Sequence, residues 1–203
     1  MTRPDWDARF GEPGFAYGTA PNDFLVEAVA LIPPGPVLSL GEGEGRNAVF
    51  LAGLGYTVHA VDGSRVGLAK AEALAAERGL SITTEVADLA GYRIAPGAWT
   101  GILAIWIHLP AEIRQPLYRS VAAGLRPGGV FVLEAYGPGQ LALGTGGPSD
   151  PALLRSAAQL QAEVPGLEWP IAREGEREIA EGRYHVGRSA TVQLAGRRAP
   201  TGA

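Results

Sequence analysis

The hydrophobic and polar positions of the chain follow two alternating patterns. Short apolar segments with β-branched residues predict strands, and longer segments with apolar residues every three or four positions predict helices. The predicted strands span residues 37–41, 56–62, 81–89, 99–107 and 130–136, and the predicted helices span 22–32, 46–55, 64–79 and 110–125. Because the two kinds of segment alternate, we expect βαβ units and a parallel sheet with helices on both faces.

The pattern changes after residue 136. Residues 137–151 are rich in Gly and Pro, and a loop of this length is often functional. A helix is predicted at about 151–163, followed by two strand-like stretches at about 167–180 and 184–195 that form an antiparallel hairpin. Residues 1–21 are aromatic and non-periodic, which favours an ordered arm. We find no internal repeat or linker, so we expect residues 1–203 to form a single α/β domain.

Composition and charge exclude several functions. The chain is 46% hydrophobic and 19% charged, with a formal net charge of -4 and a pI of about 5.4. Because it has no basic tract beyond a short Gly-Arg-Arg near the C-terminus, we expect no nucleic-acid partner. It has no apolar run of membrane-spanning length and no signal-peptide core, so we expect a cytoplasmic protein without a membrane partner.

The absence of cysteine excludes disulfides, thiolate metal sites and a cysteine nucleophile. The three histidines, His59, His108 and His185, lie far apart in the sequence. Because no two of them have a metal-ligand spacing, no metal site is predicted.

The first predicted strand ends in a loop with the sequence Gly-Glu-Gly-Glu-Gly, residues 41–45. Ligands of open parallel sheets bind at such strand-to-helix turns, where glycine lets the backbone approach closely. A dinucleotide motif requires a glycine where Arg46 stands, and the lysine of a phosphate-binding P-loop is missing. A ligand with a cationic end and no phosphate, such as S-adenosylmethionine, fits better than a tight turn without a ligand. Glu42 or Glu44 would attract its cationic groups, and the helix N-terminus near Gly45 would favour its carboxylate.

Asp62 closes the second predicted strand, about twenty residues after the first glycine. An acid at this position is placed to bind the two ribose hydroxyls of a nucleoside cofactor. The alternative is a helix cap. The combination of the glycine loop and Asp62 therefore indicates a nucleoside cofactor.

Several segments together resemble the class I S-adenosylmethionine-dependent methyltransferases. The matching segments are VLSLGEGEGRNAVFLA (37–52), AVDGS (60–64), ADL (87–89), IWIHLP (105–110) and LRPGGVFVLEAY (125–136). The resemblance extends over about residues 15–195, and FAYGTAPNDFL together with GEGRNAVFLA is most similar to the small tellurite-resistance and thiopurine methyltransferase group. It implies a doubly wound, mostly parallel seven-stranded Rossmann-like sheet whose last strand is antiparallel. The chain departs from the family at Glu42, where a small residue is commoner.

The resemblance implies a set of residues that bind S-adenosylmethionine. The backbone of the loop would approach the methionine and sugar, Asp62 would bind the ribose, and the turn after the third strand would flank the adenine. Arg46 would bind a carboxylate or form a solvent-facing ion pair. Trp106 would pack on the cofactor or in the core, and Tyr17 of the arm would cover it. The expected cofactor-binding residues are Tyr17, Gly41, Glu42, Gly43, Gly45, Arg46, Asn47, Asp62, Gly63, Ser64, Asp88, Leu89, Ile105 and Trp106.

The candidate catalytic residue is His108, which follows the fourth strand and would orient or deprotonate the acceptor, with a structural role at the helix start as the alternative. His59, inside a predicted strand, is expected to be structural. A polar rim around the substrate would comprise Glu134, Tyr136, Arg183 and His185.

The acceptor is expected to be a small molecule. The absence of cysteine argues against arsenite and cytosine-5 methyltransferases, and IWIHLP is not the Asn/Asp-Pro-Pro-aromatic motif of amino-methylating nucleic-acid enzymes. The resemblance favours a soft sulfur, selenium or tellurium nucleophile, which needs little base catalysis. Two alternatives remain: a protein-modifying methyltransferase, and a cofactor-binding module without catalysis.

Overall fold

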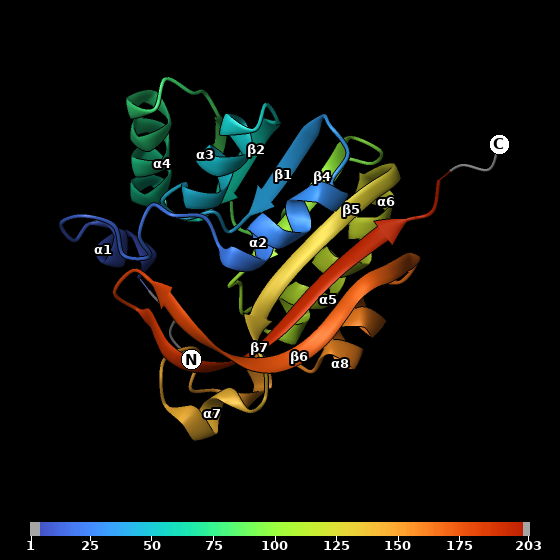
Figure 1. Ribbon diagram of the computed structural model, residues 1–203. Coiled ribbons are helices and arrows are strands. Elements are labelled where there is room, and N and C mark those ends of the chain that lie inside the picture. The colour runs from blue at the N-terminus through green and yellow to red at the C-terminus, as the bar shows by residue number, and fades with distance from the viewer. Residues whose placement is uncertain (1–4, 201–203) are drawn as a thin grey trace.

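The computed structural model describes residues 5–200, and its centre is a seven-stranded sheet in the order β3-β2-β1-β4-β5-β7-β6 (Figure 1). The strands are β1 Pro36–Leu40, β2 Thr57–Asp62, β3 Thr83–Val86, β4 Trp99–Ile105, β5 Leu125–Tyr136, β6 Leu167–Glu181 and β7 His185–Arg198. Strands β1 to β5 pair in parallel, whereas β7 is antiparallel to both β5 and β6. The predicted fold class is confirmed.

Helices cover both faces of the sheet (Figure 1). On one face lie α2 Asp23–Ala28, α3 Arg46–Gly53 and α4 Arg65–Glu77, and on the other lie α5 Ala111–Arg119, α6 Val121–Gly124 and α8 Ala157–Glu163. Side chains alternate between the faces along each strand, so Val37 belongs to the apolar cluster that contains Phe24 of α2, whereas Leu38 belongs to the cluster that contains Leu117 of α5. The sheet is therefore buried between two apolar layers.

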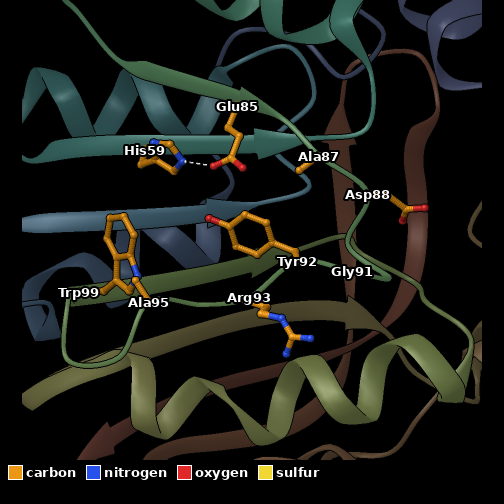
Figure 2. A pocket seen from close by; sticks show the side chains of 9 residues that line it. All are labelled: His59, Glu85, Ala87, Asp88, Gly91, Tyr92, Arg93, Ala95 and Trp99. Carbon is orange, nitrogen blue, oxygen red and sulfur yellow. Dashed lines mark hydrogen bonds and ion pairs between the residues drawn. The ribbon is translucent and has the colours of Figure 1, made fainter.

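The crossover from β3 to β4, residues 87–98, contains no helix. It runs over the face of the sheet that α5 covers elsewhere, and it leaves a pocket of about 560 Å³ beside His59 and Trp99 (Figure 2). His59 bonds Glu85 across the two neighbouring strands at 2.9 Å and stacks on Trp99. These contacts are consistent with a structural role for His59.

Several elements differ from the predicted ones, among them the helix predicted at 22–32, which is divided into α2 and the 3-10 turn η1 Val29–Leu31. The helix predicted at 151–163 begins later: a 3-10 turn at Pro151–Leu153 precedes α8, because Ser156 and Gln159 form a capping box at its start. The helix predicted at 110–125 is divided into α5 and α6, and Leu125 already belongs to β5. The strand predicted at 81–89 is limited to β3.

The N-terminal arm also differs. It contains a short helix, α1 Trp6–Phe10, that the sequence did not predict, capped by the carboxylate of Asp5. The first four residues of the predicted arm lie outside the described residues. Another short element is the helix α7 Gln140–Leu143.

Candidate active site

The glycine loop lies where β1 ends, and the strand order reverses between β1 and β4 at this point. Gly41, Gly43 and Gly45 all have positive φ, at 60°, 67° and 94°. A Cβ on Gly45 would lie 2.6 Å from Ala71 of α4, so the loop requires glycine there for both conformation and space. The carboxyl ends of the two central strands therefore open toward the loop, as expected for a ligand site of this sheet.

Glu42 is turned toward helix α3 and is almost fully buried. Its carboxylate accepts hydrogen bonds from the backbone N–H groups of Asn47 (3.1 Å) and Ala48 (3.0 Å), and from the Ser39 hydroxyl. Burial raises the pKa of Glu42 despite these bonds. Glu42 thus caps α3. It occupies N–H groups at the helix N-terminus, where the sequence had suggested a ligand carboxylate. Binding of the cofactor by Glu42 stays a prediction.

Glu44 connects the loop to the N-terminal arm. One carboxylate oxygen accepts from the backbone N–H of Ala16 at 2.7 Å, and the other accepts from Lys70 of α4 at 2.9 Å. The Lys70 ammonium also donates to the carbonyls of Glu12 and Gly14. The ring of Phe10 packs over Gly43 and Gly67. The arm therefore lies directly on the loop; that it covers the cofactor stays a prediction.

Asp62 ends β2 beside the loop and is 8% exposed. Its carboxylate accepts from the backbone N–H groups of Gly43 (2.8 Å) and Ser64 (2.7 Å). Burial raises the pKa of Asp62. An ionised carboxylate has about four lone-pair positions, so two remain for hydroxyl donors. Gly63 is exposed beside it, and Ser64 caps α4 and contacts Asp7 of the arm.

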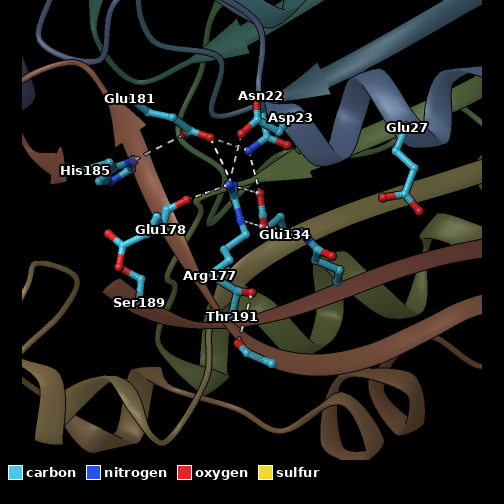
Figure 3. Close-up of polar contacts among 12 residues, drawn as sticks. Asn22, Asp23, Glu27, Glu134, Arg177, Glu178, Glu181, His185, Ser189 and Thr191 are labelled. Carbon is cyan, nitrogen blue, oxygen red and sulfur yellow. Dashed lines mark hydrogen bonds and ion pairs between the residues drawn. The ribbon is translucent and has the colours of Figure 1, made fainter. Parts of the chain in front are cut away.

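A second cluster lies at the carboxyl ends of β4 and β5, where the tip of the β6–β7 hairpin reaches the sheet (Figure 3). Glu134 is fully buried and binds Arg177 through two nitrogens, at 3.0 and 3.1 Å. Asn22 donates to Glu134 at 2.5 Å and to Glu181 at 2.9 Å. These contacts fasten the hairpin to the start of α2.

Glu181 is the centre of this cluster. Its Oε2 accepts from Arg46 Nη2 and from Trp106 Nε1, both at 2.7 Å. Burial alone would raise the pKa of Glu181, but the neighbouring His185 and Arg46 lower it to about 2. The carboxylate is therefore ionised at neutral pH and holds the loop, the end of β4 and the hairpin together.

Arg46 has one guanidinium nitrogen without a hydrogen bond. The side chain is about nine-tenths buried, and its Nη1 is buried and makes no hydrogen bond to the described residues. A buried cationic donor without a partner is costly, so it indicates a ligand with an anionic group. A carboxylate beside the glycine loop fits that position, and S-adenosylmethionine carries one.

Aromatic rings line the space next to this donor. Trp106 has a positive φ of 58°, rare for a bulky residue, and its ring lies 4.5 Å from Tyr136 and 4.9 Å from His185. Tyr17 of the arm lies 4.5 Å from His185 on the other side. The predicted residues Tyr17, Trp106, Tyr136 and His185 are thus brought together, and strain at Trp106 is typical of functional sites.

His108 contacts the same group but is already engaged. Its Nε2 accepts from the backbone N–H of Tyr136 at 3.0 Å, and its ring stacks on Tyr136. Burial, with repulsion from His185, lowers the pKa of His108 to about 3. His108 is therefore neutral at pH 7, and its Nε2 lone pair is already used in a hydrogen bond.

The other predicted residues are less central. Ile105 is buried in the core, Leu89 is half-buried, and Asp88 is exposed and accepts from the backbone N–H of Ala90. Arg183 lies at the exposed hairpin tip, where it pairs with Glu12.

Sequence reasoning missed several residues of the site, chiefly Phe10, Asn22, Arg177 and Glu181. Asn22 had been interpreted only as a helix cap, which it also is. The one sequence signal for Glu181 is its position at the hairpin turn, four residues before His185.

Residues 37–129 match the methyltransferase domain family. These residues contain the glycine loop, Asp62 and Trp106. This match supports the resemblance of the chain to the class I S-adenosylmethionine-dependent methyltransferases. It likewise supports S-adenosylmethionine as the cofactor.

Two solved structures share the methyltransferase fold. One, from work on the conversion of a disulfide bond into a thioacetal group during echinomycin biosynthesis, is 22% identical with a TM-score of 0.74, and the match covers 98% of this chain and 92% of that one. TehB from Haemophilus influenzae is 20% identical with a TM-score of 0.71, and the match covers 87% and 62%.

Among curated proteins, this chain is similar to 2-heptyl-1-hydroxyquinolin-4(1H)-one methyltransferase from Mycobacteroides abscessus. The two are 30% identical over 105 residues, which is 50% of this chain and 46% of the relative. The chain spans less than half the length of the curated relatives it matches. Within residues 5–200 no helix has the length and apolar character needed to cross a bilayer.

Proposed function

We propose that the protein transfers the methyl group of S-adenosylmethionine to a small-molecule acceptor. The observation that carries this proposal is the unpartnered Nη1 of buried Arg46, which lies beside the glycine loop of a methyltransferase domain. Asp62 at the neighbouring strand end supports it, because its carboxylate retains acceptor capacity for hydroxyls.

Under this proposal each group of the cofactor has a partner in the chain. Arg46 binds its carboxylate, Asp62 binds its ribose, and the turn at Asp88 and Leu89 flanks its adenine. The bound cofactor supplies an activated methyl group that a nucleophile can attack directly. The chain needs no covalent intermediate, which agrees with the absence of cysteine.

The contribution of the protein is alignment and the exclusion of water. The arm and the hairpin tip close over the site, because Arg183 N–H donates to the carbonyl of Ala16 and Tyr184 donates to Glu12. Trp106 and Tyr136 give the acceptor a rigid aromatic wall. Positioning of this kind contributes roughly 7–11 kcal/mol to rate acceleration.

For the acceptor we propose a small, soft nucleophile of sulfur, selenium or tellurium. His108 cannot readily take its proton, since Nε2 accepts from Tyr136 N–H and the pKa of His108 is lowered to about 3. An acceptor that arrives as an anion needs no such base. We therefore propose that His108 orients the site, and that His108→Ala lowers turnover by less than the 10²–10⁴-fold that a general base contributes.

A heteroaromatic hydroxyl is the second candidate. It is favoured by the similarity to an enzyme named for 2-heptyl-1-hydroxyquinolin-4(1H)-one and by the aromatic wall of the site. A protein acceptor and a non-catalytic cofactor-binding module are the remaining alternatives.

The proposal is tested in two steps. Calorimetry with S-adenosylmethionine, S-adenosylhomocysteine and NADH should give binding of the first two only; binding of NADH alone would contradict the cofactor assignment. Labelled S-adenosylmethionine is then incubated with a thiol, selenite, tellurite and 2-heptyl-1-hydroxyquinolin-4(1H)-one, with wild type and His108→Ala compared across pH. Label in a thiol, selenium or tellurium product supports the first acceptor class, and label only in the quinolone supports the second. If the protein binds the cofactor but methylates none of them, the small-molecule proposal fails.

A further inference from the structure

His185, at the start of β7, has an imidazole nitrogen whose hydrogen-bonding capacity is unused. The residue is 8% exposed, and Nδ1 is buried without a hydrogen-bond partner among the described residues. Glu181 Oε2 lies 3.9 Å from this nitrogen, beyond hydrogen-bond distance (Figure 3). A shift of about 1 Å in the ring would complete a Glu181–His185 pair.

The surroundings of the ring favour its neutral form. Aromatic rings of the arm, β4 and β5 enclose it, and burial lowers the pKa of His185, although the Glu181 carboxylate opposes this shift. The titratable and charged groups that face it are Arg9, Tyr17, Arg46, His108, Tyr136 and Glu181. Of these, Arg9 and Arg46 disfavour the imidazolium, as does His108 when it is protonated.

We propose that His185 is the catalytic residue on the acceptor side: it binds the acceptor through Nε2 and takes its proton, with Nδ1–H directed at Glu181. This inference rests on the proposed function. In the step, a lone pair of the acceptor heteroatom forms the bond to the methyl carbon as the bond from that carbon to sulfur breaks. The proton of the acceptor goes to His185 Nε2 and leaves later to solvent. An acceptor that is already an anion uses His185 for orientation alone.

The other polar groups nearby are less suited to this role. His108 Nε2 is occupied by Tyr136 N–H. Glu181 Oε2 already accepts two hydrogen bonds, and the pKa of about 2 makes Glu181 a weak base. Burial raises the pKa of Tyr136 to about 12, so its hydroxyl keeps its proton. His185 alone combines a neutral ring with a carboxylate able to stabilise the charge it gains.

The kinetic test uses His185→Gln, with His59→Gln in β2 as the control, because His59 contacts Glu85 and Trp99 and, among the described residues, none of those around His185. The acceptor is 2-heptyl-1-hydroxyquinolin-4(1H)-one, or a thiol if only thiols are methylated, at pH values below and above its own pKa. For the protonated acceptor we expect kcat/KM to fall about 10²-fold or more, and for the ionised acceptor less than tenfold. S-adenosylhomocysteine affinity should be unchanged, which shows that the variant is folded. Equal losses in both forms, or no loss, would overturn the inference.

An NMR measurement keeps the inference testable without turnover. The nitrogen-15 shifts of His185 in the wild-type complex with S-adenosylhomocysteine report which ring nitrogen carries the proton. We expect the Nδ1–H tautomer, directed at Glu181; the Nε2–H tautomer would contradict the inference. If the wild type methylates no acceptor in the labelled-cofactor assay, the proposed function fails. The tautomer then decides separately whether Nδ1–H of His185 is directed at Glu181.

Discussion

The two halves of the site are built in different ways. In the proposed cofactor half, carboxylates bind backbone N–H groups close in sequence: Glu42 binds Asn47, five positions away, and Asp62 binds Gly43, 19 positions away. In the proposed acceptor half, side chains bind side chains across the whole chain: Asn22 is 112 positions from Glu134 and 159 from Glu181.

This difference shows how each half depends on the rest of the fold. The cofactor half follows from one strand-loop-helix unit and the strand beside it. The acceptor half exists only when the β6–β7 hairpin, the end of β5 and the N-terminal arm meet. We therefore expect substitutions in the first half to affect mainly cofactor affinity, and those in the second to affect mainly stability and closure.

The largest expected effect is on cofactor binding, in Asp62→Ala. The variant removes the acceptor of two charge-assisted hydrogen bonds to the ribose, each worth roughly 1.5–3 kcal/mol. S-adenosylhomocysteine affinity should fall by about 100-fold or more in calorimetry, while Asp150→Ala, which removes an exposed turn cap, should leave it unchanged. An unaltered dissociation constant would place Asp62 away from the ribose.

Glu134→Leu tests the acceptor half. It leaves the donors of Asn22, Arg177 and Gln193 without their buried carboxylate, so the free energy of unfolding should fall by about 3–5 kcal/mol. The control is Glu176→Ala, which breaks the exposed pair with Arg188 and should cost at most about 1 kcal/mol. Denaturation in urea measures the unfolding free energy of both variants. Similar losses in Glu134→Leu and Glu176→Ala would refute the contrast between buried and exposed ion pairs.

Gly182→Ala probes the contact between the hairpin and the arm. Gly182 has φ 69°, and an added Cβ would lie 2.4 Å from the carbonyl of Ala16. We expect a loss of about 1–3 kcal/mol in unfolding free energy and faster release of S-adenosylhomocysteine in stopped-flow measurements. Gly175 lies within β6, where an added Cβ has open space, so Gly175→Ala should do neither. Wild-type release rates in Gly182→Ala would mean that the arm does not cover the cofactor.

The smallest effect concerns pH. Because the pKa of His108 is lowered to about 3 in the folded state, the folded protein resists a proton that the unfolded chain accepts near its ordinary value of 6.5. The stabilising contribution is present above pH 6.5 and is lost as pH falls toward 3. Between pH 6.5 and 5.5, wild type should lose up to about 1.4 kcal/mol of unfolding free energy that His108→Gln does not lose. Parallel pH profiles would show that His108 is accessible to protons; His59→Gln, at a partly exposed site, serves as the control.

Much of the fold was predictable because its signals are local. The apolar strands, the alternation with helices and the terminal hairpin are all confirmed. The errors fall where local signals compete: a capping box at Ser156 starts α8 later than the periodicity suggested, and α1 is too short to show periodicity. The roles of the predicted site residues, the single-domain organisation and a cytoplasmic location stay predictions.

By itself, the sequence determined the strand-loop-helix unit with its three glycines, because positive φ and close packing at Gly45 require glycine wherever the chain makes this turn. It also determined that Asp62 follows the neighbouring strand. Only the tertiary structure decided that Glu42 caps α3, that Arg46 retains an unpartnered nitrogen and that Glu181 joins Asn22, Arg46 and Trp106. The physical reason for the Glu181 contacts is that they depend on the register of β6 with β7 and of β7 with β5, which brings side chains from distant parts of the chain together. The Glu42 cap is local, but its direction depends on how the loop and α3 fold against each other.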